Sequence, residues 1–355
     1  MLFSKYNKFI LLILTLVIFI INGCQSVNKT LPEYNSITPI IYHRGEEQTY
    51  LTLPEWYIVY LSDEYAQFIK DTPPSKFSYF SSIKQFWSNY GKMYKITKDR
   101  YPTNIGYHVM IIVIGTSTTL EYGFKGIYEN TIGRITEFTR TNGLTDEDAF
   151  AYKSADDYVK FIRISPWYEY RFDKKLWHLW TNTNLIGKDQ IRKTERKLIL
   201  SAEYSFKAIY GLIIKALTKI SYEEPSPTTV ILVNKIPEHL LKENPDIKII
   251  ENINDQSQLV SLPRYDAFKN FATILAENGI KFKEISGNKK EILITLITNR
   301  DWKYNIDVGE ILFEEAIPSV PTQKRIAIRI SVESLNELLI NVSKQKIKLE
   351  HIYDY

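Results

Sequence analysis

The sequence predicts two domains: an all-helical domain built from two copies of one unit, then a ferredoxin-like α+β sandwich. Two blocks of residues recur in order in the first half, and short β-branched runs alternate with two helical patterns in the second. Hydrophobic residues make up 44% of the 355 positions and charged residues 24%, ordinary values for a globular protein. The net charge of +4 gives no indication of nucleic-acid binding.

Residues 1–23 have the pattern of a secretory signal peptide. Lys5 and Lys8 precede an apolar run of thirteen residues, short of the roughly 20 that a membrane span needs. Ile21-Asn22-Gly23-Cys24 resembles the lipobox of bacterial lipoproteins, which implies cleavage before Cys24 and lipid on its thiol. Cys24 is the only cysteine, so no internal disulfide can form. An uncleaved signal anchor is the alternative.

The sequence after the cysteine predicts a tether over residues 24–49, since prolines and polar residues show no period there. A lipidated Cys24 would make a membrane the partner of this chain and place it in the cell envelope. By resemblance to Gram-negative sorting rules, Gln25 favours the periplasmic side of the outer membrane. The oligomeric state is not indicated.

The helical domain is expected over residues 50–222, with copies at about 52–130 and 145–212. At a shift of 93 the helix-start pair Thr52 and Glu55 recurs as Thr145 and Asp148, with a similar order of aromatic, acidic and proline positions after it. At a shift of 82 a block of eight residues from Glu121 recurs from Glu203. Two copies packed about a pseudo-twofold axis would bury aromatic faces that one copy leaves exposed.

The apolar stretch Ile105 to Leu120 is a second candidate membrane segment. It is short and contains His108 and a Thr-Ser-Thr-Thr cluster, so we expect a buried core helix.

The α+β domain is expected over residues 226–355. Predicted helices at Tyr265 to Asn278 and Val332 to Lys344 each precede a strand, and they match at a shift of 67. Predicted strands cover 228–233, 259–262, 280–285, 292–297, 311–316, 326–330 and 347–353. Two strand-helix-strand units with extra strands favour a ferredoxin-like sandwich, which hosts many functions.

Four strings resemble those of a bacterial envelope family, across nearly all of the chain after Cys24. They are Thr-Leu-Pro-Glu-Trp-Tyr-Ile-Val-Tyr (52–60), Tyr-Glu-Asn-Thr-Ile-Gly-Arg (128–134), Leu-Pro-Arg-Tyr-Asp-Ala-Phe (262–268) and Glu-His-Ile-Tyr-Asp-Tyr (350–355). No activity is assigned to that family, so the resemblance implies no catalytic residue.

The recurring block Glu-Tyr-x-Phe-Lys-x-Ile-Tyr is the best candidate site. Lys125 follows Glu121 by four residues, and Lys207 follows Glu203 in the same way, the favourable order for a helical ion pair. Two readings stay open: exposed surface pairs, or two pairs facing each other across the axis. In the second case the charges must be mutually paired, and Tyr122 and Tyr204 would join a polar centre that lines a ligand cavity or is structural.

The other candidates have weaker signals. His108, at the start of the apolar helix, is an acid/base or ligand candidate or a helix-end hydrogen-bonding residue. Arg134 is a candidate for binding a carboxylate or phosphate, or a loop ion pair. His351 is expected to face outward on the last strand. The basic stretch from Lys174 to Lys197 is expected to be a solvated helix face, or else a contact with anionic lipid headgroups.

These patterns favour a membrane-tethered envelope protein that binds or scaffolds an envelope protein or a lipid. Phosphate loops, dinucleotide fingerprints, metalloprotease motifs and nucleophile elbows are missing from the sequence, and neither a metal site nor a cofactor is indicated. The alternative is an envelope hydrolase acting on lipid or cell-wall material, with Glu121 or Glu203 and His108 as catalytic residues. Carriage of heme or lipid is a third hypothesis.

Overall fold

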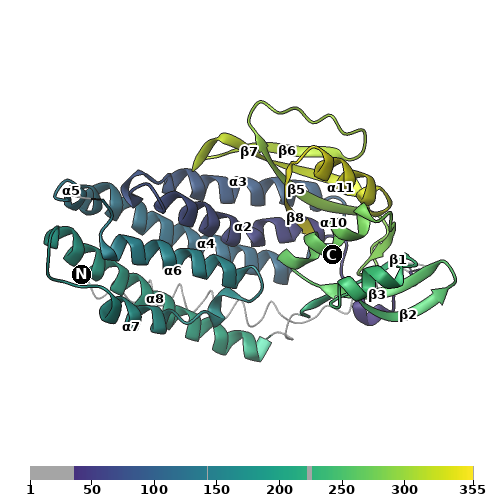
Figure 1. Ribbon diagram of the computed structural model, residues 1–355, viewed down its shortest axis with the longest axis horizontal. Coiled ribbons are helices and arrows are strands. Elements are labelled where there is room, and N and C mark those ends of the chain that lie inside the picture. Colours follow the sequence, from purple (N-terminus) through teal and green to yellow (C-terminus); the bar gives the residue numbers. More distant parts are fainter. Residues whose placement is uncertain (1–35, 142, 222–225, 355) are drawn as a thin grey trace.

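A helical N-terminal half precedes two antiparallel sheets in the computed structural model (Figure 1), which describes residues 36–354 except 142 and 222–225, with the backbone alone at 217–221. Cys24 and the predicted signal peptide lie outside the described residues. The helices are α2 (Gln48–Ile69), α3 (Tyr79–Thr97), α4 (Ile105–Tyr128), α5 (Arg134–Glu137), α6 (Asp146–Ile162), α7 (Phe172–Asn182) and α8 (Gln190–Ser221). Short 3₁₀ turns η1 (Ile40–Tyr42), η2 (Pro74–Lys76) and η4 (Trp167–Glu169) and a π-helix, η3 (Glu129–Gly133), connect them.

One of the two predicted helix starts is confirmed. Thr145 and Asp148 form a capping box at the start of α6, in which each side chain accepts from the other residue's backbone N–H. The other prediction is wrong, because α2 begins at Gln48 and Thr52 is buried within it, its hydroxyl donating to the Gln48 carbonyl. Pro54 consequently lies inside the helix, where it removes one backbone hydrogen bond.

The second half contains two four-stranded sheets with the same strand order rather than one sheet. The strands are β1 (Thr228–Asn234), β2 (Lys248–Asn254), β3 (Ser257–Pro263), β4 (Phe282–Ile285), β5 (Glu291–Asn299), β6 (Glu310–Ile317), β7 (Val320–Ser331) and β8 (Lys348–Tyr353). The orders are β2-β3-β1-β4 and β6-β7-β5-β8, and neighbouring strands are antiparallel. Helices α10 (Asp266–Glu277) and α11 (Leu335–Lys344) precede the last strand of each sheet, and α9 (Glu238–Glu243) connects β1 to β2.

The second sheet is buried on both faces. Ile294 and Ile352 pack into a core shared with α10, α11 and the first sheet, whereas Leu293 and Tyr353 pack into the aromatic core of the helical half. The Thr49 hydroxyl of α2 donates to the Tyr353 carbonyl at 3.1 Å and accepts from the Leu293 N–H at 2.9 Å. The helical half and the second sheet therefore share one core.

The expectation of a buried core helix at Ile105 to Leu120 is wrong. In α4 the side chains of Ile105, Ile112 and Leu120 are exposed, and within this stretch only Ile111 and Gly115 are fully buried. Small residues do permit close packing on the inner face, since a Cβ at Gly115 would lie 2.3 Å from the Phe86 ring. Among the described residues, no helix is both long enough and apolar enough to cross a membrane.

The described part of the predicted tether is bound to the body of the protein. The buried carboxylate of Glu284 on β4 accepts from the hydroxyl of Ser36, the backbone N–H of Ile37 and the N–H and hydroxyl of Thr38. These bonds hold the pKa of Glu284 at about 2, although burial acts in the opposite direction. Any free tether thus ends by Ser36, not at residue 49.

Candidate functional site

Two glutamates and two lysines form a closed ring of ion pairs between α4 and α8. The Lys125 ammonium lies 3.0 Å from the Glu121 carboxylate on its own helix and 2.8 Å from Glu203 on the facing helix. Lys207 repeats this arrangement, 3.0 Å from Glu203 and 2.8 Å from Glu121. Each cation contacts both anions, so the reading as two separate surface pairs is wrong. We call these four residues the quartet.

Aromatic rings cover the two cations of the quartet. The Lys125 ammonium lies 4.6 Å from the centre of the Tyr65 ring, and Lys207 lies 5.4 Å from that of Tyr158. Both contacts are within the range of cation–π attraction, which strengthens where water is excluded. The side chains of Lys125 and Lys207 are 10% and 15% exposed, so these rings and the carboxylates replace most of their hydration.

Ion pairing in the quartet outweighs the cost of burial. Burial alone would raise the pKa of Glu121, but Lys207 and Lys125 hold it at about 2. The pKa of Glu203 is lowered for the same reason, against burial and against repulsion from Glu121. Both carboxylates are therefore ionised at neutral pH, and the two lysines balance their charge. A carboxylate held ionised in this way is a poor proton donor.

The predicted ligand-binding tyrosines are packing residues of the aromatic core. Tyr122 is buried, and its hydroxyl donates to the Leu61 carbonyl at 2.9 Å. Tyr204 is equally buried and stacks on Phe172 with ring centres 6.2 Å apart. Burial raises the pKa of Tyr204 and Tyr122, so both are neutral hydroxyls at physiological pH.

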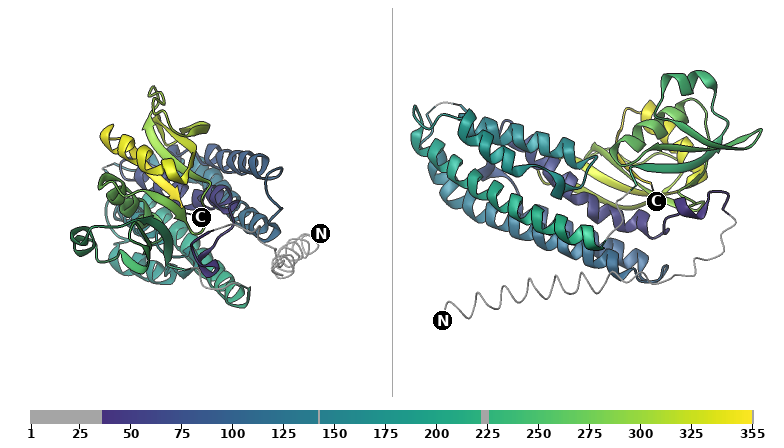
Figure 2. Two further views of the ribbon diagram at one scale, coloured as in Figure 1. Left: turned by 90° about the vertical axis from the view of Figure 1, so that its right-hand side faces the viewer. Right: turned by 90° about the horizontal axis from the view of Figure 1, so that it is seen from below.

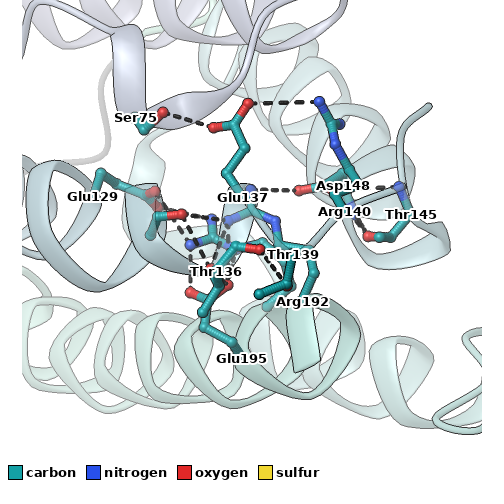
Figure 3. Close-up of polar contacts among 12 residues, drawn as sticks. Ser75, Glu129, Thr136, Glu137, Thr139, Arg140, Thr145, Asp148, Arg192 and Glu195 are labelled. Atoms are coloured by element: carbon teal, nitrogen blue, oxygen red, sulfur yellow. Dashed lines mark hydrogen bonds and ion pairs between the residues drawn. The ribbon is translucent and has the colours of Figure 1, made fainter. Parts of the chain in front are cut away.

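A second buried charge cluster lies where the π-helix η3 meets α8 (Figure 3). Arg196 contacts Glu129 at 2.7 Å and also pairs with Glu195, and Arg192 reaches Asp148 at 3.1 Å and Glu195 at 3.3 Å. All five side chains are nearly inaccessible to solvent. The Arg196 guanidinium lowers the pKa of Glu195, although burial opposes this.

This cluster corrects the interpretation of the basic stretch. Arg192, Lys193, Arg196 and Lys197 are buried, so that part of Lys174 to Lys197 is not a solvated face. Lys197, for example, donates to the Thr183 carbonyl at 2.8 Å. The signal in the sequence was the acidic residue Glu195 among the basic residues of α8. Counting only the basic residues hides this mixture of charges.

The string at 128–134 forms the π-helix of this cluster. The close packing of this cluster explains why residue 133 is a glycine. A Cβ there would lie 2.3 Å from a carboxylate oxygen of Glu129 and would displace that carboxylate from Arg196. Arg134, the predicted anion-binding residue, is exposed immediately after the π-helix. A π-helix often marks a functional position. Here the carboxylate that it carries, Glu129, forms an ion pair with Arg196 inside the protein.

A third cluster joins the helices to the second sheet, and sequence reasoning missed it. The guanidinium of Arg325 on β7 lies 3.1 Å from Glu64 of α2 and 2.7 Å from Glu350 of β8, and its centre lies 4.4 Å from the centre of the Tyr60 ring. Arg325 is 1% exposed. Burial raises the pKa of Glu64 despite Arg325, so this carboxylate is less acidic than those of the quartet.

Three of the four family-like strings meet beside this cluster. The ring of His351 on β8 lies 3.7 Å, centre to centre, from that of Trp56 on α2. Nearby, Arg264 approaches the Asp354 carboxylate at 3.7 Å and lies over Tyr265, which has an unusual backbone φ of 63°. The strings at 52–60 and 262–268 and the described part of the last string, 350–354, thus form the junction of helices and sheets.

His351 is buried, contrary to the expectation that it faces outward. It is 1% exposed, and within the described residues neither ring nitrogen has a hydrogen-bond partner. The prediction failed because the second sheet is covered on both faces and β8 has an irregular register at Thr295 and Leu296 of β5. Burial, together with the nearby Lys269 and Arg264, places the pKa of His351 well below the usual value.

His108 is not part of the quartet. It precedes Glu121 by thirteen residues on the same helix, about 20 Å along its axis. Its Nδ1 lies 3.2 Å from the Tyr90 hydroxyl, and it borders a cavity of about 10 Å³, the size of a single water. Burial lowers the pKa of His108. The structure therefore brings Glu121 and Glu203 together but leaves His108 apart from both.

Comparisons with family models, curated proteins and solved structures find no match to this chain. The resemblance of the four strings to a bacterial envelope family stays a prediction.

Proposed function

We propose that this chain is a membrane-tethered lipoprotein of the cell envelope, anchored by lipid on Cys24, whose body serves as a binding or scaffold module. One observation carries the second part of the proposal. The carboxylates predicted as catalytic, Glu121 and Glu203, are neutralised by Lys125 and Lys207 within the protein, and His108 lies far along the helix. Such groups stabilise an arrangement of helices rather than exchange protons with a substrate.

We also propose that the helices are a duplicated unit, with α2–α4 equivalent to α6–α8. Contacts at equivalent positions support this. Tyr65 packs on Phe77 with ring centres 5.2 Å apart, and Tyr158 packs on Tyr170 at 5.1 Å, both pairs being related by a shift of 93. The two-way exchange of ion pairs in the quartet follows from a pseudo-twofold axis between α4 and α8.

Hydrogen bonds support the same equivalence. The indole N–H of Trp87 donates to the Thr119 hydroxyl at 2.9 Å, and that of Trp180 donates to the Ser201 hydroxyl at 2.9 Å. The donors differ by 93 positions and the acceptors by 82, the two shifts that the sequence indicates.

Each sheet, we further propose, is a ferredoxin-like unit. The first sheet has the strand order 4-1-3-2 with helices after its first and third strands, as that fold requires. The second sheet has the same order but a loop in place of the first helix.

Lipidation of Cys24 is tested with the full chain in a Gram-negative host, using an alkyne analogue of palmitate and membrane fractionation. We expect label on the wild type and none on Cys24→Ser, which should leave the outer-membrane fraction. Label that persists in Cys24→Ser, or unchanged fractionation without any label, would contradict the anchor.

The scaffold assignment is tested by turnover assays on phospholipid and cell-wall substrates. We expect no turnover by the purified protein. Turnover that disappears in Glu121→Gln or Glu203→Gln, with the fold retained by circular dichroism, would establish a hydrolase instead. Thr145→Ala is the matched control for a loss of stability alone.

A further inference from the structure

The most exposed side chains of α4, and of α8 from residue 198 to 216, are all apolar. The exposed residues of α4 are Ile105, Ile112, Leu120, Phe124 and Ile127. In α8, from residue 198 to 216, they are Leu198, Phe206, Ile209, Leu212 and Ile213 with two alanines. Equivalent positions match closely: Phe124 and Phe206 are 62% and 63% exposed, and Ile127 and Ile209 are 64% and 61% exposed.

The two exposed stripes form one surface. Contacts between Ser117 and Tyr210, Glu121 and Lys207, and Lys125 and Glu203 show that α4 and α8 run antiparallel, side by side (Figure 2). At 100° per residue, each stripe lies about a third of a turn from this line of contact. The antiparallel directions place both stripes on the same side of the pair. The surface extends about 33 Å along α4.

Polarity is inverted across these helices. Each charged side chain that the structure describes on α4 and α8 is buried or half-buried, as the quartet and the Arg192–Arg196 cluster illustrate. A helix on the surface of a soluble protein normally has the opposite arrangement. Trp180, half-exposed on α7, borders α8 through its hydrogen bond to Ser201, and an indole of this kind suits the boundary between hydrocarbon and water.

We propose that this face of α4 and α8 rests in the hydrocarbon boundary of a lipid bilayer. The inference rests on the proposal that the protein works at a membrane, and it adds a second contact besides lipid on Cys24. Protein interfaces usually carry about one hydrogen bond per 100–200 Å² and a polar rim. A face whose most exposed side chains are all apolar over two helices complements hydrocarbon, which requires no hydrogen bonds.

The length of the N-terminal segment agrees with this placement. Ser36 is twelve residues after Cys24, so a lipid on Cys24 lies within about 40 Å of it. The described segment after Ser36 leads to Glu47, which accepts a hydrogen bond at 3.4 Å from Asn104, the N-cap of α4. Residues 36–47 thus connect the predicted anchor to the end of the helical half where α4 begins, so anchor and face can reach one bilayer.

The test measures contact with acyl chains at single positions. The full chain carries Cys24→Ser and one new thiol, Phe124→Cys or Phe206→Cys, labelled with an environment-sensitive fluorophore. It is mixed with phosphatidylethanolamine–phosphatidylglycerol vesicles, with or without brominated acyl chains. A face buried about 5–10 Å into the boundary should show about twofold or stronger quenching by brominated lipid. Ile250→Cys on β2, exposed and apolar but on the first sheet, should show none.

Further variants separate the face from other membrane contacts. In the Phe206→Cys background, Ile127→Ser, Ile209→Ser and Ile213→Ser should together abolish quenching, since each lowers partition about tenfold. The matched change Ile249→Ser should leave quenching intact. These positions are exposed, so the fold should persist, as circular dichroism can verify.

Three outcomes would overturn the inference. Vesicle binding without quenching at 124 and 206 would mean that the N-terminal segment alone attaches the protein, which leaves the proposed function standing. Equal quenching at 250 would mean nonspecific adsorption. Self-association that shields both labels from brominated lipid would show that a second copy covers the face.

Discussion

Lys125→Met should destabilise the protein strongly, because it leaves an uncompensated charge in the quartet. Lys125 lies 3.0 Å from Glu121 and 2.8 Å from Glu203, and its side chain is 10% exposed. After substitution, two carboxylates share the single cation of Lys207. Breaking a buried pair by removing one partner costs about 3–5 kcal/mol, and we expect about 3 because Glu121 is 31% exposed. In a protein of this size that lowers Tm by about 4 °C.

A double-mutant cycle isolates the pairing. Glu121→Gln with Lys207→Met leaves the neutral Lys125–Glu203 pair, so the double variant should be about 2 kcal/mol more stable than the sum of the single losses predicts. Chemical denaturation at pH 7 measures each free energy of unfolding. The control is Lys160→Met, which removes an exposed pair with Asp156 at the same i, i+4 spacing and should leave the stability almost unchanged. Equal effects of Lys125→Met and Lys160→Met would refute the reasoning.

The quartet also predicts that the stability of the protein depends on pH in the acidic range. The folded pKa of Glu121 is about 2, below its usual value of 4.5, so ionisation contributes stability above pH 4.5 that is lost as pH falls toward 2. The shift corresponds to about 3 kcal/mol, which solvent screening at this partly exposed group reduces to about 2. The difference in unfolding free energy between wild type and Glu121→Gln should shrink from pH 7 to pH 3. A constant difference would contradict the ion-pair account.

Three further predictions concern other parts of the fold. Gly115→Ala should cost about 1–3 kcal/mol, because its Cβ would meet the Phe86 ring, and thermal unfolding measures this loss. Thr145→Ala should cost about 1 kcal/mol by removing the cap on Asp148 N–H, with no change in vesicle contact. For His351, whose folded pKa is depressed, stability should fall below pH 6.5 by at most about 1.4 kcal/mol per pH unit, since only the unfolded chain binds the proton. His351→Phe should lose this slope between pH 6.5 and 5.5, and a retained slope would assign it to another group.

Local patterns predicted most strands and both long helices of the second half well, but not the division of the strands into two sheets. Most strands and both long helices lie within two or three residues of their expected bounds, because β-branched runs and helical periodicity are local properties. The sequence patterns did not predict β2 or α9. The strand Lys248–Asn254 is almost entirely exposed, so burial imposed no alternating pattern on it. The helix Glu238–Glu243 is short and gives little periodicity.

Pairings between distant residues explain what else was missed. Arg325 meets Glu64 only because β7 packs on α2, and no spacing along the chain indicates that contact. The quartet could be predicted as one of two alternatives because its Glu and Lys lie in a block that recurs along the chain. Repetition of this kind favours a symmetric contact. His351 was misassigned because alternation identifies one buried face, whereas this sheet is covered on both.

The wrong prediction that α4 is a buried core helix has a physical explanation. Hydropathy measures preference for a non-aqueous environment, and the Ile105 to Leu120 stretch has that preference whether or not the chain itself supplies the environment. In the folded protein α4 turns Ile112 and Leu120 outward and directs Glu121 and Lys125 toward α8. Burying four charges is costly, and a closed neutral ring offsets that cost while leaving the outer faces free of charge. The arrangement that neutralises the quartet therefore also leaves the outer face apolar, and the lipid surface we propose would supply the environment that this face prefers.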